Sequence, residues 1–350
     1  MRRALATLGV LGLTQCHSPP PAPPAQPAVQ VPAVPVPPTV ATVAPAPVVP
    51  PAAPKVPEPP PPRLVSAGAV IVWIADPKAR GGFRSALVEP APDGAKVIAE
   101  RPEVILASSK DLWVLRTKKT YAVGCAECDK CTDDPPCTRN ALTPRDEPYL
   151  QSLRTRRVLE PWSDAFVPSK GCADDLSSQD ADATLTGAVG PVFFAEVGKS
   201  GMGCHSAHPF SDSGPLAFDL DAEAPVTLTF PAAPLDTLKA AAHKELTAEE
   251  CASNPDNDPD PYEATAAYGE GGVLHGVYAF TMSAPYFCGG GPGHYSILNT
   301  QTSPWLPPEL AAYGKLPAFA ASYMASKKAT FAMPIAAERV AAAEKEMARH

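Results

Sequence analysis

The proline-rich stretch near the N-terminus constrains this chain more than any other feature. Of the 46 prolines in the 350 residues, 20 lie between Ser18 and Pro62. Proline fixes φ and removes the backbone N–H donor, so neither a helix nor a sheet propagates through such a stretch. Its only fully charged residues are Lys55 and Glu58, with Arg63 just beyond its end. We therefore expect a disordered but stiff stalk with much polyproline II character.

The residues before this stretch indicate export. Arg2 and Arg3 precede an uncharged, mostly apolar run that ends at Thr14. This run is too short to cross a bilayer as a helix, which needs about 20 residues. A basic start followed by a short apolar run is typical of a secretory signal.

The end of the apolar run adds a more specific expectation. Leu13-Thr14-Gln15-Cys16 resembles the signal of bacterial lipoproteins, although Gln15 stands where that family prefers Gly, Ala or Ser. The resemblance implies that Cys16 carries a lipid, that a membrane is the partner of this lipid, and that the protein belongs to the bacterial cell envelope. An ordinary cleaved signal peptide is the alternative.

These features divide the chain into three parts. We predict a signal peptide at 1–15, the lipid-anchor cysteine with the stalk at 16–63, and a globular domain at 64–350. The last part, about 290 residues, is long enough to bury a sizeable core. The net charge of -8 comes without a Lys/Arg-rich run, so the basic surface that nucleic-acid binding requires is missing.

Eight cysteines remain after Cys16, four of them in VGCAECDKCTDDPPC at 123–137. An even number in an exported chain favours disulfides. The candidates are Cys125, Cys128, Cys131, Cys137, Cys172, Cys204, Cys251 and Cys288. An iron–sulfur site fits less well, because five residues rather than three precede the fourth cysteine. Zinc is the main alternative, with C-x2-C spacing here and His205 and His208 as nitrogen ligands, but the usual second C-x2-C pair is missing.

The fold class follows from short apolar runs separated by turn residues. We expect strands at 69–76, 83–89, 95–100, 103–108, 111–117, 119–125, 183–189, 191–197, 215–220, 225–230 and 273–282. Helices are expected only later, at 235–252, 307–313, 317–328 and 334–350. Within the first of them, Thr247 and Glu250 have the spacing of a capping box. The pattern predicts a mainly β fold, α+β overall, with an antiparallel sandwich or barrel-like core and C-terminal helices; an irregular propeller is the second choice.

A second candidate metal site lies in SNPDNDPDPYE. Asp256, Asp258 and Asp260 alternate there, and oxygen ligands at this spacing suit calcium. An EF-hand loop would need Gly at Pro261 and Glu at Ala267, so that motif is absent. The stretch resembles a fragment of the calcium repeats of thrombospondin type 3, and a solvated acidic loop is the alternative interpretation.

The remaining signals favour a binding protein over an enzyme. Besides the two zinc candidates, His275 and His294 are separated in sequence and act as ligands only if the fold brings them together. Neither G-x-S-x-G nor H-E-x-x-H occurs, so no catalytic residue is assigned. We expect an envelope lipoprotein whose β-rich domain binds or scaffolds an envelope protein or a glycan, with no cofactor. The alternative is a secreted enzyme of unfamiliar type, such as a metal-dependent hydrolase.

Overall fold

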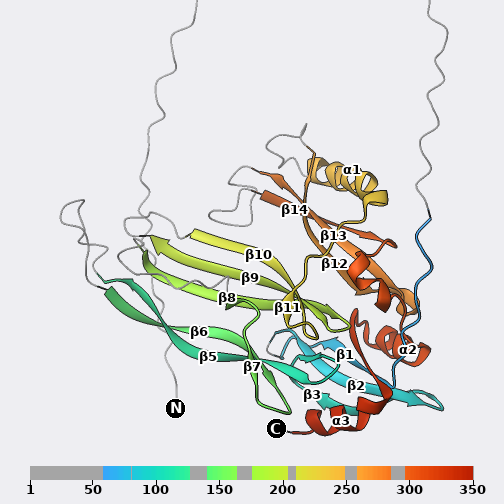
Figure 1. Cartoon of the computed structure of the whole chain (residues 1–350). Coiled ribbons are helices and arrows are strands. Elements are labelled where there is room, and N and C mark those ends of the chain that lie inside the picture. Colours follow the sequence, from blue (N-terminus) through green and yellow to red (C-terminus); the bar gives the residue numbers. More distant parts are fainter. Residues whose placement is uncertain are drawn as a thin grey trace, which may run out of the picture. The chain divides into compact units, whose positions relative to one another are not determined.

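Three β-sheets make up most of the described chain (Figure 1). The structure is a computed structural model, and it describes residues 58–79, 81–126, 140–163, 176–203, 210–248, 258–284 and 296–349. All of these residues belong to one compact unit. The signal peptide and the stalk up to residue 57 lie outside the described residues, so the expectations for them stay predictions.

The largest sheet has eight strands in the order β11-β10-β9-β8-β15-β1-β2-β3. Its strands are β1 (Ala69–Ala75), β2 (Phe83–Ala91), β3 (Gly94–Arg101), β8 (Leu176–Val189), β9 (Val192–Gly203), β10 (Phe210–Asp219), β11 (Ala224–Pro225) and β15 (Phe331–Ile335). Neighbouring strands are antiparallel except β15 and β8, which pair in parallel. The sequence of β1, AVIVWIA, is an unbroken apolar run because both of its faces are buried.

Two smaller sheets complete the β structure. The four-stranded sheet has the order β4-β5-β6-β7 and the three-stranded sheet the order β12-β13-β14. The strands are β4 (Ile105–Ala107), β5 (Leu112–Cys125), β6 (Asn140–Ser152), β7 (Val158–Leu159), β12 (Asp260–Tyr268), β13 (Leu274–Ser283) and β14 (Ser296–Ser303). The prediction of a mainly β fold with antiparallel sheets is confirmed, and the sheets that the structure describes do not close into a barrel.

The eight-stranded sheet has a hydrophobic core on each face, and β1 shows how. Ile71 and Trp73 belong to a core that also includes residues of β4, β5 and α3, so this face packs against the four-stranded sheet as in a sandwich. Val70 and Val72 point the other way, into a second core with α2 and the three-stranded sheet. Successive side chains along β1 therefore enter the two cores alternately.

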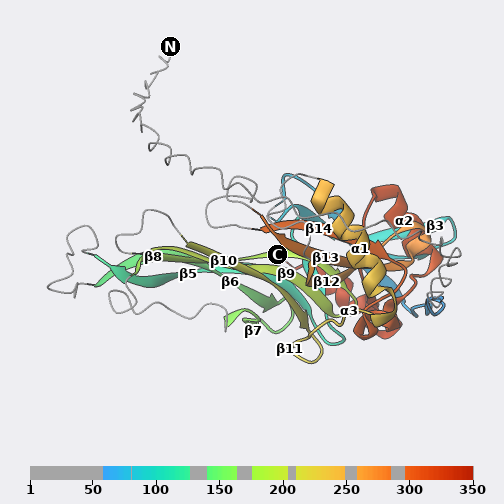
Figure 2. The ribbon, with the colours of Figure 1, turned by 90° about the horizontal axis from the view of Figure 1, so that it is seen from above.

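The helices lie late in the chain, as expected, and gather at one end of the long strands (Figure 2). They are α1 (Ala232–Ala248), α2 (Ala318–Lys327) and α3 (Val340–Met347), with short 3-10 turns η4 (Glu270–Gly272), η5 (Pro308–Tyr313) and η6 (Ala337–Arg339). In α1, Leu238, Ala242 and Leu246 recur every four residues and pack on the three-stranded sheet, forming a third core. None of the described helices is long and apolar enough to cross a membrane.

Two details of the helix prediction are wrong. Thr247 does not cap a helix, because it lies inside α1 and its hydroxyl donates to the carbonyl of His243 at 2.7 Å. The helix expected at 334–350 begins later, since Pro334 lies in β15, where it pairs with Val70 of β1. The helix itself follows a 3-10 turn and starts at Val340.

The strand prediction also differs from the structure in places. The runs at 111–117 and 119–125 form a single strand, β5. The segment at 226–230 is not a strand, although Val226, Leu228 and Phe230 alternate as strand residues do. These side chains instead pack into the second and third cores, because an extended connection buries alternate residues without pairing. Strands β6, β7, β12, β14 and β15 were not expected from the sequence.

Candidate functional site

Most residues that the sequence singled out lie outside the described residues. They are Cys16, Cys128, Cys131, Cys137, Cys172, Cys204, Cys251, Cys288, Asp256, His205, His208 and His294. The structure describes the surroundings of Cys125, Asp258, Asp260 and His275. Hypotheses that depend on the first group therefore stay predictions.

Cys125 is the last residue of β5, where it lies opposite Asn140 of β6. It is 5% exposed and disulfide-bonded. A disulfide sulfur is not a thiolate, and only the thiolate binds zinc. The pairing of the other seven candidates and the zinc alternative at 128–137 stay open, since those residues are not described.

The described members of the candidate metal sites are not gathered into a centre. Asp258 and Asp260 are both exposed, and Asp260 begins β12 opposite Thr281. His275 lies in β13, opposite Ala267. Among the described residues, no group of three His, Cys, Asp or Glu side chains lies close enough to hold a metal ion.

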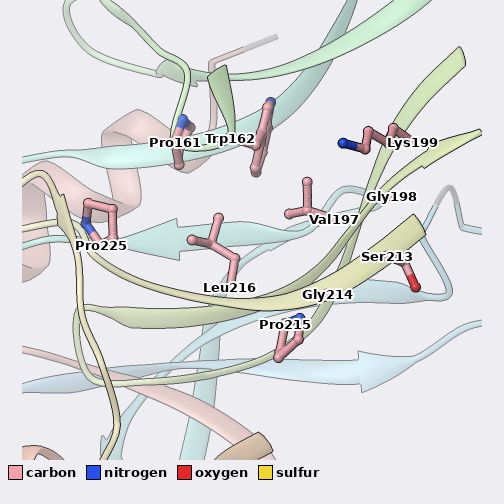
Figure 3. Close-up of a pocket in the computed structure, with 10 residues that line it drawn as sticks. All are labelled: Pro161, Trp162, Val197, Gly198, Lys199, Ser213, Gly214, Pro215, Leu216 and Pro225. Carbon is pink, nitrogen blue, oxygen red and sulfur yellow. The ribbon is translucent and has the colours of Figure 1, made fainter. Parts of the chain in front are cut away.

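A pocket of about 390 Å³ forms between strands β9 and β10 and the segment that follows β7; we call it the edge pocket (Figure 3). In the register of these strands, Val197 lies opposite Gly214 and Ala195 opposite Leu216. Side chains alternate along a strand, so Gly214 belongs to the same face as Leu216 and the core residue Phe218. Because Gly214 has no side chain, this face is hollow there, and a Cβ placed on it would meet no atom within 4 Å.

Trp162 forms the wall opposite these strands. Its Nε1 donates to the carbonyl of Pro148 at 2.6 Å, and its ring makes an edge contact with Phe193, with 6.3 Å between centroids. The indole is only 2% exposed, so both its polar atom and its orientation are fixed. Trp162 therefore acts as a rigid apolar surface.

One cation lies among these apolar groups. Lys199 extends toward Trp162, and Val197 and Leu216 point into the same space (Figure 3). The rest of the rim is formed by Pro161, Pro215, Pro225, Gly198 and Ser213. An apolar hollow with a few polar groups at its rim is the usual form of a site that holds a compact apolar group.

The strand beside the pocket is protected against pairing with another strand. Val226 N–H donates to the carbonyl of Ala217 at 2.9 Å, so Ala217 directs its backbone groups away from β9. The backbone of Pro215, two residues earlier, faces the same side of the strand, and proline has no N–H group to donate there. In the part of the chain that the structure describes, strand β11 pairs with Phe218 and Asp219 and does not extend to Pro215. A proline on an edge strand prevents a further strand from adding, so the pocket rather than the strand edge is suited to binding.

No binding site was expected at the residues of the edge pocket. The signal that was present is the Ser213-Gly214-Pro215 step, which places two strand-breaking residues inside a strand. Glycine within a strand indicates close approach of another group or missing side-chain volume, and proline indicates an edge. Neither residue type indicates what lies opposite, so the contribution of Trp162 was not predictable.

Comparisons with known proteins add little to this geometry. No family model and no curated protein matches the sequence. Among solved structures, the chain is similar to a DUF3298 family protein from Pseudomonas aeruginosa PAO1, with 14% identity over 59% of this chain and 96% of that chain. The TM-score is 0.27, and a likeness at this level carries no argument about function.

Proposed function

We propose that this chain is a bacterial envelope lipoprotein whose β-rich domain binds a partner protein by accepting one apolar side chain in the edge pocket. The observation that carries the binding role is the hollow at Gly214, which faces the fixed indole of Trp162. Nothing on the described part of the domain fills this hollow. A site of this form holds a ligand without rearrangement of the backbone.

The walls of the edge pocket favour a protein side chain over a glycan. Trp162, Val197 and Leu216 offer apolar surface, and the indole N–H is already bonded to Pro148. A sugar ring carries hydroxyl groups on its whole rim, and each needs a hydrogen-bond partner once it is buried. The described rim supplies few such groups, whereas an aliphatic or aromatic side chain needs none.

The proposal of a lipid anchor is based on the sequence alone. Cys16 ends the apolar run of a signal-like N-terminus, and the proline-rich stretch joins it to the domain. A lipid at one end of a stiff segment and a domain at the other would hold the edge pocket away from the membrane surface. A single acyl chain binds a membrane only weakly, so stable anchoring requires more than one chain on the lipidated cysteine.

Substitution of Gly214 tests the pocket. Gly214→Leu should fill the hollow without a clash, because its new Cβ meets open space. We would titrate full-length protein with N-acetyl-leucine amide and N-acetyl-phenylalanine amide, following the backbone NMR signals of Val197 and Gly214. Both amides should shift these signals in the wild type, and Gly214→Leu should abolish the shift at Val197. Thr302→Leu, at an exposed position on β14, is the matched control.

Two results would contradict this function. Shifts with N-acetylglucosamine but not with the amino-acid amides would replace the protein partner with a glycan. Shifts that persist in Gly214→Leu would place binding elsewhere on the domain.

The anchor has its own experiment. Cys16→Ala should move the protein from the membrane fraction to the soluble fraction and abolish incorporation of a labelled fatty acid, because the attachment atom is lost. Ser18→Ala, two residues away, should behave like the wild type. Retention of Cys16→Ala in the membrane fraction would show that the chain is held there by something other than this lipid.

A further inference from the structure

A second cavity lies inside the sandwich, between the four-stranded and the eight-stranded sheet; we call it the inter-sheet cavity. Its volume is about 560 Å³, within the range of small-molecule sites. Leu115 and Pro148 line it from β5 and β6, and Ala183 and Leu185 line it from β8. Val104 closes one side. Apart from Pro148, these walls are parts of the first core or pack against it, so the cavity continues the hydrophobic core rather than the surface.

The hollow has a simple cause. Nearby, the space between the sheets is filled by three rings, with Trp73 at 5.8 Å from Phe83 and 5.9 Å from Phe331 between centroids. At the inter-sheet cavity, the facing positions carry the small side chains of Ala183 and Thr117 instead. Small residues on facing strands leave volume that the sheets, held by their own ladders, do not collapse to fill. An apolar hollow of this kind does not hold ordered water well.

The mouth of the inter-sheet cavity carries excess positive charge, although the whole chain has a net charge of -8. Its charged lining groups are Lys78, Arg116 and Glu103. Glu103 is bound by Arg116 and also by Arg101, whose Nε donates to it at 2.8 Å. A single carboxylate is thus shared by two guanidinium groups, so it does not neutralise the mouth.

The two cations at the mouth differ in how they are held. Lys78 lies in the β1–β2 turn, where its backbone N–H donates to the Asp76 carboxylate at 2.9 Å. This bond positions the backbone of the turn, and within the described residues the ammonium group has no partner. Arg116 is fixed through its Nη1 on Glu103. Burial alone raises the pKa of Glu103, but the hydrogen bonds from Arg116 and Arg101 lower it below its ordinary value. Glu103 is therefore ionised at neutral pH and keeps Arg116 at the mouth.

We propose that the inter-sheet cavity binds a single acyl chain with an anionic head, the chemistry of a fatty acid or a lysophospholipid. The chain lies between Leu115 and Leu185, where it replaces missing core volume, and the head lies at Lys78 and Arg116. Insertion of the chain removes apolar surface from water, which favours binding. The cations select an anionic head over a neutral or cationic one. This site is separate from the edge pocket and does not depend on it.

Three amphiphiles of equal chain length test the proposal by isothermal titration calorimetry on the full-length protein. Dodecanoate should bind saturably at one site. Dodecan-1-ol should bind at least tenfold more weakly, since it lacks the charge-assisted contacts with Lys78 and Arg116. Dodecyltrimethylammonium should not bind. Lauroyl lysophosphatidate, added to the same assay, distinguishes a phospholipid source from a free fatty acid by its higher affinity.

Variants locate the site. Lys78→Gln, in an exposed turn, should weaken dodecanoate binding several-fold, whereas Lys119→Gln should not, because Lys119 is 82% exposed and does not line the cavity. Ala183→Phe should abolish binding by filling the cavity, with thermal unfolding as the check on its fold. Gly214→Leu should leave dodecanoate binding unchanged, so failure of the edge pocket and failure of this site are distinguishable.

Three results would overturn the proposal. They are equal binding of the three amphiphiles, no saturable binding of dodecanoate, and equal effects of Lys78→Gln and Lys119→Gln.

Discussion

The two halves of the long strands differ in how they are stabilised. Strand β9 begins as VFFAEV, with Phe193 and Ala195 completely buried, and ends as GKSGMG, where Lys199 and Ser200 are half-buried. Strand β5 changes in the same way, from fully buried Leu112 to Tyr121, which is 68% exposed. The ladder of backbone hydrogen bonds continues through both halves. The first halves are therefore held mainly by core packing. The second halves mix exposed residues with a few buried ones, such as Ala122, and depend more on pairing with their neighbours.

This difference separates the part of the sheets that carries most of the core packing from the part that holds the edge pocket. A two-stranded ribbon is marginal in water unless other strands or covalent links support it. The second half of β5 ends at the disulfide-bonded Cys125, which supplies such a link. The edge pocket and its Lys199 lie where the packing of β9 gives way to polar residues. Binding sites are commonly placed at such transitions, because a rigid core positions a surface that the core itself does not need.

The largest loss of stability is expected from a substitution in the core-packed first halves of the long strands. Trp73→Ala should lower the free energy of unfolding by about 3–5 kcal/mol, because it removes a fully buried ring from the cluster with Phe83 and Phe331. It also leaves the carbonyl of Ile105 without its donor, Nε1 of Trp73. Chemical denaturation gives the value. If the loss in free energy of unfolding were smaller than that caused by substitution of an exposed residue, the first halves would not dominate the stability of the domain.

A buried carboxylate provides a second, smaller test. Glu346 of α3 is 2% exposed, and its Oε2 accepts the N–H of Leu112 at the start of β5, at 3.2 Å. Glu346→Gln should cost about 1–3 kcal/mol, since the buried N–H and the nearby Arg339 lose an ionised acceptor. Asp146→Asn is the control in the exposed half: its ion pair with Lys119 is solvent-exposed, and such pairs contribute about 0–1 kcal/mol. Equal losses for the two variants would remove the distinction between the halves.

The smallest effect is expected at the apolar side chains of the exposed half. Leu142→Ser should change the free energy of unfolding by less than about 0.5 kcal/mol, because Leu142 is 67% exposed and already faces water. Hydrogen exchange on the same sample sharpens the comparison: amides of residues 119–125 should exchange faster after reduction of the disulfide at Cys125, while those of 112–115 should not change. Equal acceleration in both segments would mean that β5 opens as one unit.

Several strands were predictable because the residue types within each of them and at its ends are enough to indicate a strand. Strands β1, β2 and β13 are apolar, rich in β-branched or aromatic residues, and bounded by turn residues. Strand β6 was not predictable, because Pro144 and Pro148 interrupt it. The structure tolerates both prolines because β6 pairs with β7 only at Leu150 and Gln151, so the rest of its outer edge needs no N–H donors.

The sequence by itself determined the class of the domain, one of short strands with helices added late, and it predicts a proline-rich stalk before that domain. Those properties depend on residues near one another in the chain, through φ restriction and side-chain alternation. Only the tertiary structure decided that Gly214 faces Trp162 and that Lys78 and Arg116 share the mouth of one cavity. Such sites consist of missing volume and converging charge, which arise when strands distant in sequence are brought into register. Composition and local sequence patterns do not contain that information, because they do not specify which faces of the strands and sheets pack against one another.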